Sequence, residues 1–127
     1  TPGMTAADGA VAAAHWLALP AGHRPDGVFA ANDMLAMGFI DALRAAAVRV
    51  PDDVALIGFD NLPAAAWAPY DLASFAQPVA RMVEGVLAHI TGARAPGAAP
   101  PPVGMQRLPA TAIVRGSLGL ADSEARP

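Results

Sequence analysis

The 127-residue sequence contains no cysteine, and only 15% of its residues are charged. The lack of cysteine excludes disulfide bonds and thiolate chemistry, and it is consistent with a cytoplasmic protein. No apolar run approaches the roughly 20 residues that a membrane-spanning helix needs. No run of Lys or Arg occurs, and the net charge is -3. These residues are therefore not expected to grip the phosphate backbone of a nucleic acid.

The motifs that would identify an enzyme are also absent. No G-x-S-x-G turn surrounds a serine, and no G-x-x-x-x-G-K-[ST] or G-x-G-x-x-G loop is present to hold a nucleotide cofactor. His15, His23 and His89 lack the spacing of metal ligands, so neither a metal nor a cofactor is expected. Asp33 and Asp60 could form a carboxylate pair for acid–base catalysis. A helix-start residue and a ligand acceptor explain them with fewer assumptions, and we expect no enzyme.

The composition that remains is that of a globular domain. Hydrophobic residues make up 54% of the chain, and its length suffices for one domain or part of one. The chain begins Thr1-Pro2-Gly3, with neither an initiator Met nor a signal peptide. We therefore expect it to be a segment of a longer protein.

The stretch around which the chain is organised is the apolar run Val54–Ile57. Four consecutive apolar residues predict a strand buried on both faces in a parallel sheet. The run stops at Gly58-Phe59-Asp60-Asn61, and open α/β sheets bind ligands just beyond the carboxyl ends of their strands. Asp60 is therefore placed either to accept hydrogen bonds from a small polar ligand or simply to start a turn.

A helix and a strand precede this stretch. Thr5 and Asp8 have the spacing of a capping box and predict a helix that continues to about Leu19. A short apolar strand is predicted at Val28–Ala31. The apolar face of the helix is expected to comprise Ala10, Ala13, Ala14 and Leu17.

A second helix connects the two strands. Asn32 is a preferred N-cap residue and Asp33 suits a first helical turn, so the helix is predicted from there to about Ala47. It carries more apolar surface than one sheet face can cover, and we therefore expect a second packing partner. Strand, helix and strand should form a right-handed crossover.

The remaining chain contains one further helix. An extended piece is predicted at 72–75, and Gln77-Pro78 should start the helix, which ends at Thr91-Gly92. A loop rich in Pro, Gly and Ala follows at 93–102, then a final strand at 107–115 and a frayed tail from Gly119. The apolar stripe of the helix comprises Val79, Met82, Val83, Val86, Leu87 and Ile90.

Two segments resemble the lactose-repressor/galactose-repressor (LacI/GalR) family. Residues 29–38 (FAANDMLAMG) resemble its F-A-A-N-D-x-x-A-x-G segment, and residues 49–61 (RVPDDVALIGFDN) resemble its R-V-P-x-D-V-x-V-I-G-F-D-[DN] segment. The closing elements also match, with Gln77-Pro78 and Met82 followed by Leu108-Pro109 and Val114-Arg115-Gly116-Ser117. The resemblance covers about residues 5 to 118, in order and at the family's spacing.

The resemblance implies a transcriptional regulator with an N-terminal helix-turn-helix and a two-lobed effector domain. The fold class is then α/β, a parallel sheet flanked by helices, as part of a periplasmic-binding-protein-like type I (Rossmann-like) domain. Residues 1–76 would be the C-terminal lobe, 77–106 the hinge and a helix that packs on an absent first lobe, and 107–127 the return strand and tail. The helix-turn-helix and the opening strand of this lobe would also lie outside the chain.

The resemblance also implies binding residues. The family's sugar-contacting Asn and Asp fall on Asn32 and Asp60, and two further ligand contacts fall on Met4 and Val79. The expected partners are a small effector, for which a carbohydrate is expected, and operator DNA contacted only through the absent N-terminal domain. A cytoplasmic homodimer is expected, whose interface comprises Met34, Met37, Asp41, Arg44 and Trp67.

Two other readings remain open. A periplasmic sugar-binding protein would share the N-D and G-x-D elements, but usually not the Gln-Pro hinge or the V-R-x-S ending. A structural or protein-interaction module is supported only by the wide apolar surface of the helix that Asn32 starts. An upstream gene segment encoding a helix-turn-helix would separate a regulator from a transport protein.

Overall fold

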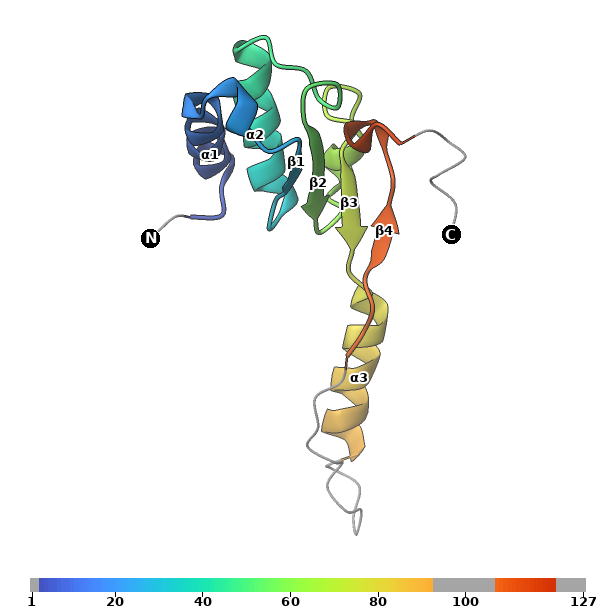
Figure 1. Ribbon diagram of the computed structural model, residues 1–127. Coiled ribbons are helices and arrows are strands. Elements are labelled where there is room, and N and C mark those ends of the chain that lie inside the picture. Colours follow the sequence, from blue (N-terminus) through green and yellow to red (C-terminus); the bar gives the residue numbers. More distant parts are fainter. Residues whose placement is uncertain (1–2, 93–106, 121–127) are drawn as a thin grey trace. The chain divides into compact units, whose positions relative to one another are not determined.

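The computed structural model describes residues 3–92 and 107–120 of the chain (Figure 1). Four strands and three α-helices alternate with short 3₁₀ turns. The predicted loop 93–102 lies outside the described residues, as does the predicted tail beyond residue 120. In chain order the elements are α1 (Ala6–Ala18), η1 (Ala21–His23), β1 (Gly27–Phe29), α2 (Asp33–Ala45), β2 (Ala55–Phe59), η2 (Pro63–Ala66), β3 (Ala73–Ala76), α3 (Val79–Gly92), β4 (Thr111–Ile113) and η3 (Gly116–Leu118).

The chain divides into two compact units. The first comprises Thr1–Ala76 and Ala112–Pro127, and the second comprises Gln77–Thr111. The first unit holds α1, α2 and β1 to β3, and the second holds α3. The assignment of such units to two lobes of an effector domain stays a prediction.

The sheet confirms the predicted α/β architecture. Its strand order is β1-β2-β3-β4, with β2 parallel to both β1 and β3. In the register, Val28 lies beside Leu56, and Phe59 lies beside Phe75. Because β1, β2 and β3 are parallel, their carboxyl ends lie at one edge of the sheet, where ligands bind in folds of this class.

Only one face of β2 is buried, which corrects the prediction of burial on both faces. Leu56 and Gly58 are buried, whereas Ala55, Ile57 and Phe59 on the opposite face are only partly buried. The buried face lies against α2, which contacts β2 directly. On the other face, the aromatic rings of Phe59 and Phe75 pack at a centroid distance of 6.3 Å, and Phe75 contacts Phe29 at the same distance.

The second packing partner expected for α2 is α1. These two helices make the most extensive contact between elements in the described structure. Glycine permits their close approach: a Cβ at Gly38 would overlap the carbonyl oxygen of Ala6, and a Cβ at Gly9 would overlap that of Leu35. The buried residues of α2 therefore face both the sheet and α1, and they are Asp33, Ala36, Met37, Gly38, Phe39, Ile40 and Leu43.

The buried face of α1 agrees in part with the prediction. Its buried residues are Gly9, Ala13 and Trp16, and of the other predicted residues Ala10 and Leu17 are partly buried whereas Ala14 is exposed. The Trp16 ring packs edge-on against Phe39 at a centroid distance of 6.5 Å, and its Nε1 donates to the carbonyl oxygen of Pro25. The large Trp16 side chain thus determines which face of α1 is buried.

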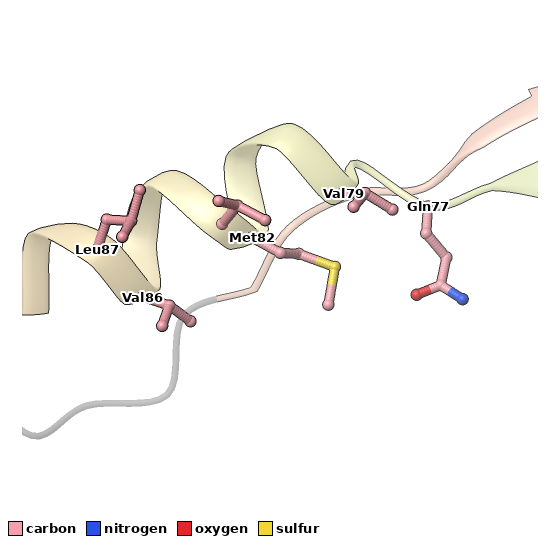
Figure 2. Close-up of a pocket in the computed structure, with 6 residues that line it drawn as sticks. Gln77, Val79, Met82, Val86 and Leu87 are labelled. Atoms are coloured by element: carbon pink, nitrogen blue, oxygen red, sulfur yellow. The ribbon is translucent and has the colours of Figure 1, made fainter. Parts of the chain in front are cut away.

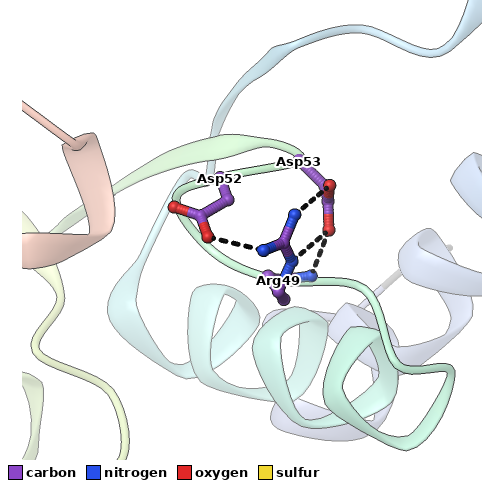
Figure 3. Close-up of polar contacts among 3 residues, drawn as sticks. All are labelled: Arg49, Asp52 and Asp53. Carbon is purple, nitrogen blue, oxygen red and sulfur yellow. Dashed lines mark hydrogen bonds and ion pairs between the residues drawn. The ribbon is translucent and has the colours of Figure 1, made fainter.

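The turn between α2 and β2 is held by an arginine (Figure 3). The Arg49 guanidinium pairs with both Asp52 and Asp53, at 3.0 and 3.2 Å. The hydrogen bonds from Arg49 lower the pKa of Asp53, and the Asp53 side chain raises the pKa of Arg49. Ala47, with φ of 57°, ends the preceding helix earlier than predicted, because a left-handed residue cannot continue a right-handed helix.

Among the described residues, no helix has the length and apolar character needed to cross a membrane.

The capping box at Thr5 and Asp8 forms as predicted, and the Asp8 side chain also accepts from the Gly3 amide. The final strand is shorter than predicted, since β4 spans only Thr111–Ile113 within the predicted 107–115.

We expect Gly38→Ala to lower the free energy of unfolding by about 1–3 kcal/mol, because the added methyl forces α1 and α2 apart. Gly22→Ala is the matched control, since a Cβ there meets no atom within 4 Å. Urea denaturation of both variants measures the difference. Equal stability of the two variants would show that α1 and α2 do not pack through their backbones.

Candidate ligand-binding site

Polar side chains gather beyond the carboxyl ends of two neighbouring strands. Asn32 and Asp33 follow β1 after a short connection, and Asp60 and Asn61 follow β2 directly. Since β1 and β2 are parallel neighbours, these residues lie at the same edge of the sheet. The structure therefore places the two principal predicted contacts, Asn32 and Asp60, at one end of the sheet.

Asn32 has a structural role at the start of α2. Its Oδ1 accepts from the Leu35 amide at 2.8 Å, which makes it the N-cap that the sequence predicted. Its Nδ2 donates to the carbonyl oxygen of Met4 at 3.0 Å. This bond joins two of the predicted ligand contacts directly, and it ties the residue before α1 to the start of α2.

Asp33 is fully buried, although it was expected only to favour the start of a helix. Its Oδ1 accepts from the Ser74 hydroxyl at 2.6 Å, and its Oδ2 accepts from the Leu62 amide at 2.7 Å. The carboxylate also lies in the first turn of α2, where the helix dipole favours negative charge. A Cβ at Gly58 would overlap Asp33 Oδ1, so the strand needs glycine at this position.

The loop after β2 has an unusual backbone. Asp60 and Asn61 have φ of 106° and 50°, a region that residues other than glycine rarely adopt. Each such residue costs on the order of 1–3 kcal/mol and persists only where its surroundings hold it. The Asp60 amide donates to the carbonyl oxygen of Phe75, and the Asn61 amide donates to Ser74 Oγ, so both residues are fixed to β3.

The return segment after β4 also contributes to the loop. Arg115 donates from one nitrogen to the carbonyl oxygen of Leu72 at 2.6 Å and from another to Asn61 Oδ1 at 2.8 Å. Ser117 is buried, donates to the Leu56 carbonyl and accepts from the Ala73 amide, and so bridges β2 and β3. The V-R-x-S ending was identified in the sequence only through its resemblance to the family. No local sequence pattern predicted these contacts.

The other two predicted ligand contacts are exposed apolar residues. Met4 lies just before α1 and contributes its carbonyl oxygen to Asn32. Val79 is the first residue of α3 and belongs to the second unit. A hydrogen bond thus joins Met4 to Asn32, whereas Val79 belongs to the other unit. Within residues 3–92 and 107–120 no cluster of metal-ligating side chains occurs.

Met37 is the one predicted interface residue that the structure removes from the surface. It is only 6% exposed and belongs to the hydrophobic core of the described residues. Met34 and Trp67 are exposed, at 43% and 60%. These two remain the exposed apolar residues of the predicted interface, and the interface itself stays a prediction.

Asp41 and Arg44 link α2 to the segment after η2. They pair with each other at 2.8 Å, Arg44 also donates to the Pro69 carbonyl, and the Tyr70 hydroxyl donates to Asp41. Burial, followed by the hydrogen bond to Asp41, raises the pKa of Tyr70. These contacts hold residues 67–70, and hence the exposed Trp67, against α2.

An open α/β sheet with polar side chains beyond its carboxyl ends defines the class of α/β ligand-binding domains. The sequence profile of the family described as Periplasmic binding protein-like domain matches residues 1–118. The chain therefore belongs to the periplasmic binding protein-like domains, within the group found in LacI-type transcriptional regulators.

Bacterial regulators are among the relatives that the chain resembles. The chain is 43% identical over 70 residues to the HTH-type transcriptional regulator DegA of Bacillus subtilis, covering 55% of this chain and 20% of DegA. It is 41% identical over 59 residues to the transcriptional repressor PurR of Photobacterium profundum, covering 46% of this chain and 18% of that protein. The matched part thus spans about a fifth of the length of these relatives.

Solved structures of the family share the fold. A LacI family regulator from Lactobacillus casei with bound sucrose has a TM-score of 0.71 and 34% identity, covering 89% of this chain and 40% of that one. A LacI family regulator from Enterococcus faecalis with bound ribose has a TM-score of 0.76 and 26% identity, covering 91% and 41%.

We expect Asn32→Ala to lower the free energy of unfolding by about 1 kcal/mol, because α2 loses its N-cap. Asn32→Asp should keep most of that stability, since a carboxylate caps a helix equally well. Thermal denaturation of the two variants measures this. Equal losses in both would show that the bond to Met4, and not the cap, carries the effect.

Proposed function

We propose that this chain is the ligand-sensing part of a LacI-type transcriptional regulator. In the complete protein a helix-turn-helix domain would precede it and bind operator DNA in the cytoplasm, and the effector would modulate that binding. The observation that carries the proposal is the fixed loop in which Asp60 lies beyond the carboxyl end of β2, at the same edge of the sheet as Asn32. The match to residues 1–118 supports it.

The effector we propose is a small carbohydrate. Asp60 would accept hydrogen bonds from sugar hydroxyls, Asn32 would contribute its amide, and Met4 would flank the ligand. Two structural neighbours contain bound sugars, namely sucrose and ribose, and this supports the ligand class. A carboxylate suits the role because hydrogen bonds to charged groups are stronger than neutral ones.

We expect Asp60→Ala to weaken sugar binding by the complete regulator about tenfold to a hundredfold, since a hydrogen bond to a charged group contributes about 1.5–3 kcal/mol. Calorimetric titration with sucrose, glucose and ribose measures the affinity. Asp26→Ala is the control, because Asp26 lies exposed before β1, at the opposite end of the strand. Equal affinities in the Asp60 variant and the wild type would remove Asp60 from the site.

A periplasmic-type sugar-binding protein is the second candidate, because it would share the same lobe. The two functions differ in what precedes the chain in the gene. We expect an upstream segment that encodes a helix-turn-helix. An upstream secretion signal joined directly to a first lobe would favour the transport protein.

We also propose that the regulator is a homodimer whose interface includes Met34, Asp41, Arg44 and Trp67. Met34 and Trp67 expose apolar surface, and the contacts of Asp41 and Arg44 hold the Trp67 segment beside α2. A symmetric dimer suits a regulator of palindromic operators, because protein and DNA then share a two-fold axis.

Trp67→Asp is expected to shift the regulator towards monomer in sedimentation experiments, because a charge at a packed interface is left without a partner. Val11→Asp serves as the control, since Val11 is equally exposed but lies on α1. A Trp67 variant that keeps the mass of the wild-type dimer would contradict the proposed interface.

The apolar stripe of α3 is the surface that we propose to pack on the first lobe of the regulator. All six residues of the stripe are between 45% and 60% exposed. Five of them, with Gln77, line a groove of about 300 Å³ along the helix (Figure 2). A stripe of this kind would otherwise leave several large apolar side chains in water, at about 1.5–3 kcal/mol each.

A further inference from the structure

The loop Asp60–Leu62 is held by one buried pair of side chains. Asp33 and Ser74 are both fully buried, and they are joined by the hydrogen bond from Ser74 Oγ to Asp33 Oδ1. Ser74 Oγ accepts from the Asn61 amide at 3.0 Å, while Asp33 Oδ2 accepts from the Leu62 amide at 2.7 Å. Two consecutive amides of the loop therefore depend on the same pair.

The pair lies between three elements that meet at the ligand-binding end of the sheet. Asp33 begins α2 directly after Asn32, Ser74 lies in β3, and Gly58 in β2 leaves the space that Asp33 Oδ1 occupies. Both side-chain oxygens of Asp33 and the hydroxyl of Ser74 are thus engaged. Because both residues are fully buried, neither side chain is accessible to a ligand.

The backbone that the pair holds is strained, and this makes the contact more than packing. Asp60 and Asn61 have positive φ values, which are uncommon for residues other than glycine. Without acceptors for the Asn61 and Leu62 amides, the loop would relax towards commoner conformations and the Asp60 carboxylate would move with it. A binding site gains affinity when such groups are fixed before the ligand arrives.

We propose that Asp33 and Ser74 are positioning residues for the effector site: together they fix the Asp60–Leu62 backbone so that the Asp60 carboxylate faces the ligand. This inference rests on the proposed function, because it assumes that Asp60 contacts the effector. It assigns a role in ligand affinity to two residues that do not touch the ligand.

Ser117 offers a matched control. Like Ser74, it is a buried serine whose hydroxyl donates one hydrogen bond and accepts one from a backbone amide, but its donor bond goes to the Leu56 carbonyl and it joins β2 to β3. Its contacts are with Leu56 and Ala73, so they lie away from the Asp60–Leu62 loop. Ser74→Ala and Ser117→Ala therefore remove equivalent groups, and only the first should affect the loop.

The first measurement is amide hydrogen exchange of the 127-residue chain by NMR. We expect Ser74→Ala to accelerate exchange at the Asn61 and Leu62 amides by about tenfold or more, because local opening becomes easier. Ser117→Ala should leave those two amides at the wild-type rate. Equal acceleration in both variants, or none in Ser74→Ala, would overturn the proposal.

The second measurement is sugar titration of the complete regulator with sucrose, glucose and ribose. We expect Ser74→Ala to weaken binding by about tenfold, as the loss of supporting contacts does at other preorganised sites, and Ser117→Ala to bind like the wild type. Asp33→Asn is the second variant and should also weaken binding, because asparagine has one accepting side-chain oxygen where aspartate has two, so it cannot accept from both Ser74 and Leu62 as Asp33 does.

The outcomes separate this inference from the function on which it rests. A loosened loop with unchanged sugar affinity would overturn the positioning role while leaving the sugar site in place. If the wild-type regulator binds none of the three sugars and the loop still opens in Ser74→Ala, the proposed effector is wrong and the fixing of the loop by the pair is supported.

Discussion

The arrangement of this domain depends on one buried carboxylate. Burying a charged group is costly unless hydrogen bonds replace its water, and Asp33, the first residue of α2, receives them from the Ser74 hydroxyl in β3 and from the Leu62 amide in the loop after β2. Each of these partners comes from a different element, so the carboxylate fixes α2, β3 and the loop after β2 together. Gly58 completes the arrangement by leaving room for it.

The same physical logic gives the domain its two different surfaces. Glycines allow α1 and α2 to make backbone contact, and α2 packs on one face of the sheet. The opposite face carries Phe29, Phe59 and Phe75, which pack on one another and stay partly exposed. Asn32, Asp33 and Asp60 lie beyond the carboxyl ends of β1 and β2, and the bond from Ser74 ties the buried Asp33 to β3.

The sequence was informative where the deciding contact is local. The cap at Asn32 and the strand that ends before Asp60 follow from neighbouring residues, and the structure confirms both. It could not reveal the partners of Asp33, which lie 29 and 41 residues away, or the bond from Ser117 to Leu56. Met37 was misplaced for the same reason, because helical spacing identifies a face without showing which element covers it.

A crystal structure of the complete regulator grown with ribose would test the central claim most directly. We expect sugar hydroxyls within about 3 Å of the Asp60 carboxylate, with Asn32 beside them and the Asp33–Ser74 hydrogen bond intact. A well-ordered sugar bound elsewhere, or one that contacts neither Asp60 nor Asn32, would contradict it.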